Sequence, residues 1–216
     1  MAIASNGATT ETARRAVIAP PVEQVESDSS STNLVRESSP FPLGLVADGA
    51  ASNAQNEELA RLLWEYAESG SPYTFAWLDD FLASNPDRPW RGSLFLNRGL
   101  IERYNGFISA SFTSFEQAWA ALQASSDPML RSYANRALAE LIAIKAGLGR
   151  MDELEALFEQ AQGRHFLGEA SQLIASAREG LASMKKFPER SFNCGPAALL
   201  NVLAALGDEA AADPRI

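Results

Sequence analysis

The chain has 216 residues, with 27 acidic and 18 basic side chains and a formal net charge of -9 at neutral pH. This length allows one or two domains and a tail. Because an acidic surface repels DNA, RNA and anionic lipid, we expect neither nucleic acid nor membranes as partners. A single cysteine, Cys194, and a single histidine, His165, exclude an intrachain disulfide and predict no structural metal and no cofactor.

The amino terminus has no basic region followed by an apolar stretch, as a secretory signal would. No window approaches the run of about 20 apolar residues that spans a bilayer. The sequence as written therefore predicts a cytoplasmic chain, and secretion by another route stays open.

Residues 1–52 are rich in small and polar side chains and have no apolar period of a helix or a strand. We predict that they form a disordered arm. Two apolar patches within it, residues 16–22 and 41–46, carry prolines that favour extended backbone. These patches either dock on a partner as extended peptides or belong to an unstructured leader.

Helical periodicity begins at Asn53 and ends at Gly70, with acidic residues in the first turn. A second helix is predicted from Tyr73 to Ala83, before a proline-containing segment that disfavours further helix. Two helices joined by a glycine-containing turn predict an antiparallel helical hairpin.

The next hairpin is predicted from helices over residues 93–104 and 114–124, with Gly106 at the turn. A shift of 43 positions brings Gly106 to Gly149. The same shift relates Phe95 to Leu138, Phe115 to Phe158 and Ala118 to Ala161. A repeated hairpin indicates a helical solenoid, in which each hairpin buries its apolar face on the next; the alternative is an irregular helical bundle.

Four residues match the spacing of the tetratricopeptide repeat: Gly99, Gly106, Phe115 and Ala118. Residues 54–185 therefore resemble that family, which implies an all-α, right-handed solenoid of stacked antiparallel hairpins. The second copy keeps Leu138, Leu141, Gly149, Phe158 and Ala161. The chain departs from the family at Phe95, Arg98, Glu102, Gln123 and Ile142, and its 43-residue offset exceeds the family's period of about 34.

We place the helical-repeat domain at residues 53–187 and assign residues 188–216 to the start of a second, truncated domain or to a capping helix. Residues 197–206 read as a helix that is apolar around its full circumference, which predicts burial on every side. Its cover is then the solenoid, missing sequence or another chain.

Cys194 lies at the predicted start of this helix, where free amides and the helix dipole stabilise a thiolate. The segment resembles the nucleophile helix of papain-like peptidases that trim leaders in bacterial bacteriocin export. The matching residues are Cys194, Gly195, Ala198, Leu199, Val202 and Leu203. The family's oxyanion-hole glutamine position holds Pro188, and no histidine follows Cys194. We therefore expect the chain alone to lack this peptidase activity.

The favoured function is a noncatalytic interaction or scaffold module that binds a protein or an extended peptide, within a larger protein. The alternative is the amino-terminal fragment of a multidomain cysteine peptidase with Cys194 as nucleophile. His165 is interpreted as a surface or structural residue. Four acids hint at a basic partner or form a solvated face: Asp79, Asp80, Glu153 and Glu155.

Overall fold

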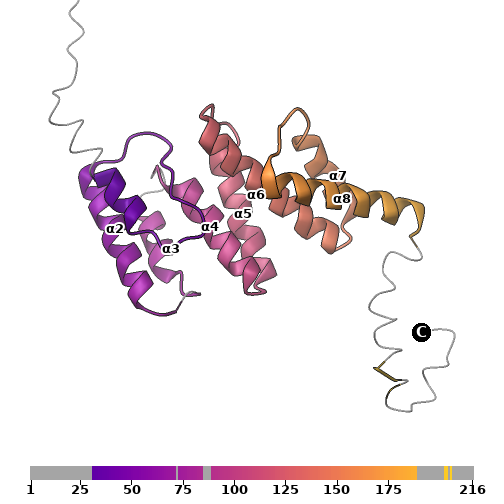
Figure 1. The fold of residues 1–216 in the computed structure, drawn as a ribbon, viewed down its shortest axis with the longest axis horizontal. Coiled ribbons are helices and arrows are strands. Elements are labelled where there is room, and N and C mark those ends of the chain that lie inside the picture. Colours follow the sequence, from indigo (N-terminus) through magenta and orange to yellow (C-terminus); the bar gives the residue numbers. More distant parts are fainter. Residues whose placement is uncertain (1–30, 72, 85–88, 189–201, 204, 206–216) are drawn as a thin grey trace, which may run out of the picture.

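The computed structural model describes residues 31–71, 73–84, 89–188, 202–203 and 205. Within these ranges the regular secondary structure is helical and includes no strand, which confirms the predicted all-α class for this part of the chain. The helices follow one another along the molecule from α2 to α8 (Figure 1). None of the helices described is long and apolar enough to cross a lipid bilayer.

The helices differ in length from 8 to 20 residues. Their bounds are α2 Asn53–Glu68, α3 Ala76–Ala83, α4 Arg91–Tyr104, α5 Ile108–Leu122, α6 Pro128–Gly147, α7 Met151–Gln160 and α8 Gly168–Lys186. Residues 31–37, ahead of α2, are also helical. The predicted helix over residues 114–124 begins six residues earlier in the structure, because α5 starts directly after the turn at Gly106.

Local sequence explains where two of the helices begin. The Ser52 hydroxyl accepts a hydrogen bond from the Gln55 backbone, and the Gln55 side chain accepts one from the Ser52 backbone, so α2 starts with a complete capping box. At α6 the Asp127 carboxylate accepts from two backbone N–H groups, and Pro128 occupies the first turn, where proline is tolerated.

The turns after α4 and α6 have the same hydrogen bonds, 43 positions apart. Gly106 and Gly149 adopt positive φ angles of 82° and 67°, a conformation that glycine reaches without strain. Phe107 N–H donates to the Glu102 carbonyl at 2.8 Å, and Arg150 N–H donates to the Lys145 carbonyl at 3.1 Å. The shared turn glycine therefore marks the same local structure at both places.

The core runs between successive helices. α4 packs on α5, α5 on α6, and α6 on both α7 and α8. At the α4–α5 contact, a Cβ atom added to Gly99 would lie 2.6 Å from the ring of the fully buried Phe115. Because glycine has no Cβ, the two helices approach closely at this point.

The structure corrects the predicted boundary of the arm. Residues 31–52 pack against the helices: Val35 and Leu45 are buried, and the Asn56 side chain donates to the Ser31 hydroxyl at 3.0 Å. Apolar period alone missed this packing, because extended and proline-containing backbone can be held by side-chain hydrogen bonds from other elements. Residues 1–30 of the predicted arm lie outside the described residues.

Candidate binding groove

Residues 39–48, here called the strap, run without regular secondary structure beside α4 (Figure 1). The Asn97 side chain accepts a hydrogen bond from Leu43 N–H at 2.8 Å. The Ser93 hydroxyl interacts with both backbone groups of Val46: it accepts from the N–H at 3.2 Å and donates to the carbonyl at 2.8 Å. Two side chains one helical turn apart on α4 therefore bind the main chain of the strap.

A third side chain that hydrogen-bonds to the strap comes from α6. The Tyr133 hydroxyl donates to the Gly44 carbonyl at 2.6 Å. Burial raises the pKa of the Tyr133 phenol, although the charge of Arg36 acts in the opposite direction. The phenol therefore stays protonated and able to donate at neutral pH. Asn97, Ser93 and Tyr133 all bind main-chain atoms of the strap. These hydrogen bonds therefore do not depend on the side chains of the strap.

Strap side chains add apolar contacts. Leu45 is 1 % exposed and belongs to the core. The ring of Phe41 lies with its centroid 5.7 Å from that of Tyr66, in a tilted arrangement. The strap is therefore anchored by one buried leucine and one aromatic contact in addition to its hydrogen bonds.

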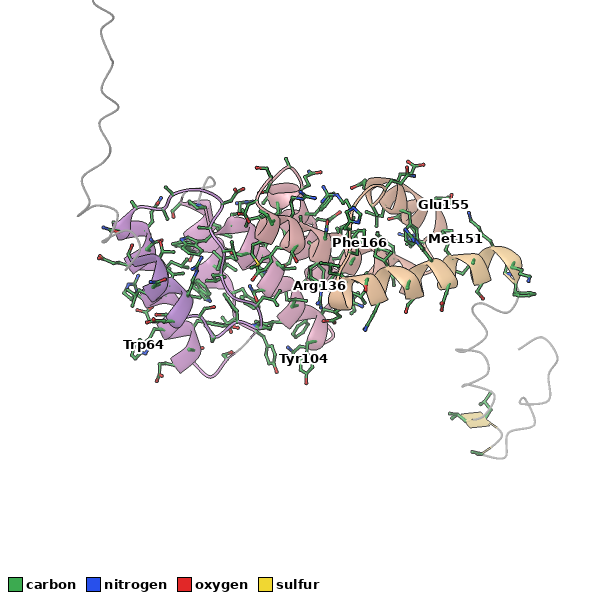
Figure 2. All side chains as sticks on the ribbon, turned by 45° about the horizontal axis from the view of Figure 1, so that its top comes forward. Trp64, Tyr104, Arg136, Met151, Glu155 and Phe166 are labelled. Carbon is green, nitrogen blue, oxygen red and sulfur yellow. The ribbon has the colours of Figure 1, made fainter. Side chains whose placement is uncertain are left out.

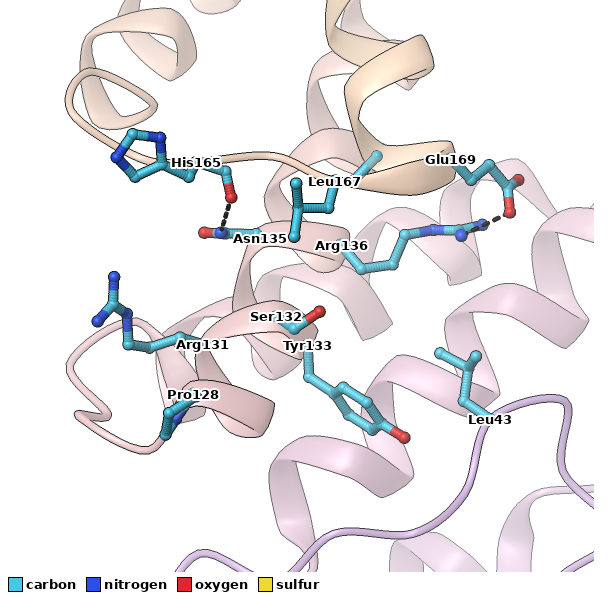
Figure 3. Close-up of a pocket in the computed structure, with 11 residues that line it drawn as sticks. Leu43, Pro128, Arg131, Ser132, Tyr133, Asn135, Arg136, His165, Leu167 and Glu169 are labelled. Atoms are coloured by element: carbon cyan, nitrogen blue, oxygen red, sulfur yellow. Dashed lines mark hydrogen bonds and ion pairs between the residues drawn. The ribbon is translucent and has the colours of Figure 1, made fainter.

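Two cavities flank the strap, and Leu43 lines both of them. The smaller, of about 330 Å³, lies between the start of α6 and the start of α8 (Figure 3). The larger, of about 970 Å³, is bordered by α2, α4, α6 and α8 and is here called the aromatic groove. The two cavities share Leu43, Arg136 and Glu169 as lining residues, so both lie next to the strap.

The smaller cavity is shaped by the α6 side chain of Asn135. Its amide donates to the His165 carbonyl at 2.9 Å (Figure 3). Its oxygen accepts from Arg164 at 3.0 Å. Burial and the nearby charge of Arg131 lower the pKa of Arg164. His165 itself is exposed, and it is its backbone carbonyl that Asn135 binds. The structure thus gives the His165 backbone a positioning contact.

The aromatic groove has mainly apolar walls. Its lining includes the aliphatic residues Leu100, Ile101 and Leu173, the tyrosines Tyr66, Tyr73 and Tyr104, and the strap residues Pro40, Pro42 and Leu43. Tyr73 and Tyr104 stand at the rim with 53 % and 91 % of their surface exposed. Burial raises the pKa of the Tyr66 phenol, which lies deeper.

The charged residues that line the aromatic groove are paired with one another. Glu140 is 3 % exposed and forms ion pairs with Arg103 from α4 and Arg136 from its own helix. Arg136 also pairs with Glu169 at the start of α8, at 2.6 Å. Burial lowers the pKa of Arg136, but its hydrogen bonds with Glu169 and Glu140 and their charges raise it overall. This network joins α4, α6 and α8 beneath the groove.

A matching network lies one hairpin earlier. Arg98 forms ion pairs with Glu102, one turn on along α4, and with Asp79 of α3 at 2.5 Å. Glu102 also accepts from the Ser114 hydroxyl of α5 at 2.6 Å. Burial acts to lower the pKa of Arg98, and the two carboxylates outweigh it and raise the pKa. Both carboxylates of this network, Asp79 and Glu102, are therefore bound by other side chains of the protein.

Three of the four acids that suggested a basic partner are ion-paired. Asp79 pairs with Arg98, Glu153 with Lys145 at 2.5 Å, and Glu155 with Lys185. Their charges link neighbouring helices, so these acids do not form a vacant site for a basic ligand.

Sequence reasoning missed a signal for both networks. Asn97 and Asn135 each begin the pattern Asn-Arg-x-Leu-x-Glu, and the two copies are 38 positions apart. This register differs from the 43-position shift that relates the turns, because α6 has five more residues than α4 between the glutamate and the turn glycine. Before the glutamates, the two helices correspond at an offset of 38 positions. The predicted correspondence between Phe95 and Leu138, which uses an offset of 43, therefore does not apply to this part of the helices.

Cys194 and the residues that resemble a nucleophile helix lie outside the described residues, apart from Val202 and Leu203. In the ranges that the structure describes, no group of three or more His, Cys, Asp or Glu side chains could hold a metal ion. No protein-family model, curated protein or solved structure matches the chain.

Proposed function

We propose that residues 53–187 form a noncatalytic, tetratricopeptide-like helical-repeat module that binds an extended peptide of a partner protein. The observation that carries this proposal is the strap itself. An extended segment with two prolines already lies on the helices, with its backbone held by Asn97, Ser93 and Tyr133. A surface that binds main-chain groups in this way tolerates many side-chain sequences.

The cavities on both sides of the strap support the same function. A site of about 970 Å³ is at the upper end of the roughly 300–1,000 Å³ that ligand pockets occupy. The turn glycines and the close approach at Gly99 agree with the hairpin geometry that the resemblance implies. A partner segment either extends the strap into the open space or replaces it.

The test uses a fluorescein-labelled peptide with the sequence of residues 39–48 and the 216-residue chain carrying Leu45→Ala. Removing a buried leucine side chain costs about 2–5 kcal/mol, and here this cost weakens docking of the strap. We expect the variant to bind the peptide at least about tenfold more tightly than the unmodified chain, measured by fluorescence anisotropy. Circular dichroism establishes that the variant keeps its helices.

A second substitution identifies the groove as the place of binding. Adding Asn97→Ala to the Leu45→Ala chain should lower the affinity for the peptide about tenfold, because the hydrogen bond from the peptide backbone to the Asn97 side chain is lost. Asn33→Ala, at an exposed asparagine ahead of α2, is the matched control and should leave the affinity unchanged. Equal binding with and without Asn97, or no binding to a folded variant, contradicts the proposal.

A further inference from the structure

The rim of the aromatic groove exposes two large side chains, Tyr73 and Tyr104. Tyr104 is the last residue of α4, is 91 % exposed, and makes no side-chain hydrogen bond to any described residue. Tyr73 is 53 % exposed, and its ring contacts Phe107 edge-on at 5.8 Å. Exposed tyrosines beside an apolar hollow are typical of surfaces that bind another molecule, because the ring gives contact area at low entropy cost.

The charges of the groove decide what kind of ligand fits. Its four charged lining residues are Arg103, Arg136, Glu140 and Glu169, and each is ion-paired with another of the four. A charged ligand would compete with these pairs, and breaking those of Glu140, which is 3 % exposed, is strongly unfavourable. The groove therefore favours an uncharged ligand, even though the chain as a whole is acidic.

The strap indicates the backbone conformation and the residue type that suit this surface. Pro40 and Pro42 line the groove, and Phe41 between them contacts Tyr66. Two prolines thus already form part of the groove lining, together with the three tyrosines. A proline-containing segment is extended before it binds, so it loses little conformational entropy on docking against aromatic side chains.

We propose that the aromatic groove binds an uncharged, proline-containing extended segment of a partner protein, which lies beside the strap and packs its prolines on Tyr73 and Tyr104. This inference rests on the proposed function and adds the chemistry of the ligand. It requires no displacement of the strap, because the groove is open with the strap in place.

The probe is a fluorescein-labelled peptide, Ala-Val-Ile-Ala-Pro-Pro-Val, which has the uncharged sequence of residues 16–22. It is titrated by fluorescence anisotropy against the unmodified 216-residue chain. We expect binding that falls about tenfold when both prolines are replaced by alanine, and similarly when Ile and the last Val are replaced by two Lys or two Glu. Raising NaCl from about 0.05 to 0.5 M should change the affinity less than about twofold, because no unpaired charge takes part.

Two variants locate the site. Tyr104→Ala should weaken binding of the peptide at least about fivefold, because it removes an aromatic ring on which the peptide prolines pack. Trp64→Ala removes an aromatic residue of α2 that is 61 % exposed and does not line the groove (Figure 2), so it should change the affinity less than about twofold. An equal loss of peptide affinity in the Tyr104→Ala and Trp64→Ala variants would overturn the proposal.

The remaining outcomes are also decisive. A chain with Pro20→Ala and Pro21→Ala that binds the probe more than about tenfold better than the unmodified chain would show that residues 16–22 already occupy the groove, and would overturn the assignment to a partner. If the labelled strap peptide binds the Leu45→Ala chain but the proline probe does not bind the unmodified chain, this inference fails and the proposed function stands. If neither binds, both fail.

Discussion

The side chain of Asn97 accepts a hydrogen bond from Leu43 N–H at 2.8 Å, and Asn135, at the same place in the second Asn-Arg-x-Leu-x-Glu pattern, donates one to the His165 carbonyl at 2.9 Å. Each asparagine thus holds the backbone of a segment that crosses its helix. Both are buried, so each hydrogen bond forms away from competing water. The two helices present the same side chain for the same kind of contact.

Replacing Asn97 with alanine tests how much this contact stabilises the fold. The change removes its hydrogen bonds to Leu43 N–H and to the Ser93 carbonyl, and Leu43 N–H loses its side-chain acceptor. We expect the free energy of unfolding to fall by about 1–3 kcal/mol, measured by urea denaturation. Asn33→Ala, at an exposed position, should cost less than about 0.5 kcal/mol. A similar loss in the two variants would mean that the strap contact adds little.

The close approach of α4 and α5 gives a second prediction. A Cβ on Gly99 would lie 2.6 and 2.7 Å from two atoms of the buried Phe115 ring, so Gly99→Ala should lower the free energy of unfolding by about 1–3 kcal/mol. Gly180 in α8 has no atom within 4 Å of the added Cβ, and there Gly→Ala should stabilise by about 0.4–1 kcal/mol. Chemical denaturation of both variants checks the opposite signs; stabilisation by Gly99→Ala would contradict this account of the helix contact.

The helices were predictable because their signals are local. The apolar period around Leu59 and Leu63, the end of α4 at Tyr104 and the turn glycines Gly106 and Gly149 all depend on residues within a few turns. The start of α5 was missed, although Ile108 and Phe112 extend the helical spacing of Phe115 toward the amino terminus.

The strap and the groove depend on contacts that local pattern does not encode. Tyr133 binds the Gly44 carbonyl across 89 positions of sequence, and Asn97 reaches Leu43 across 54. The prolines did predict extended backbone for residues 41–46, but not the surface on which it lies. The ion pairs could have been anticipated from the second Asn-Arg-x-Leu-x-Glu pattern, whereas the partner Glu169 lies on another helix and required the fold.

The buried carboxylate of Glu140 gives a third prediction. It lies between Arg103 and Arg136, so Glu140→Gln leaves two guanidinium groups with reduced compensation. Breaking a buried pair of this kind costs about 3–5 kcal/mol. Glu65→Gln is the matched control, because Glu65 pairs with Arg61 on the exposed face of α2, where such pairs contribute about 0–1 kcal/mol. An equal loss of stability in the two variants, measured by thermal or urea unfolding, would show that the Glu140 network contributes no more than a surface ion pair.

The ion pair between Glu153 and Lys145 predicts a dependence of stability on pH. The hydrogen bond from Lys145 and the charges of Lys145 and Arg150 hold the pKa of Glu153 below its ordinary value of 4.5. Between the lowered pKa and 4.5 the unfolded chain binds more protons than the folded chain, so this contribution is present above about pH 4.5 and is lost as the pH falls through the folded pKa. Glu153→Gln should therefore flatten the fall in melting temperature below about pH 4.5, measured from pH 7 downwards. Glu116→Gln, at an exposed carboxyl with no ion pair to any described residue, should keep the shape of the unmodified curve. If Glu153→Gln also leaves that shape unchanged, the ion pair does not contribute to acid sensitivity.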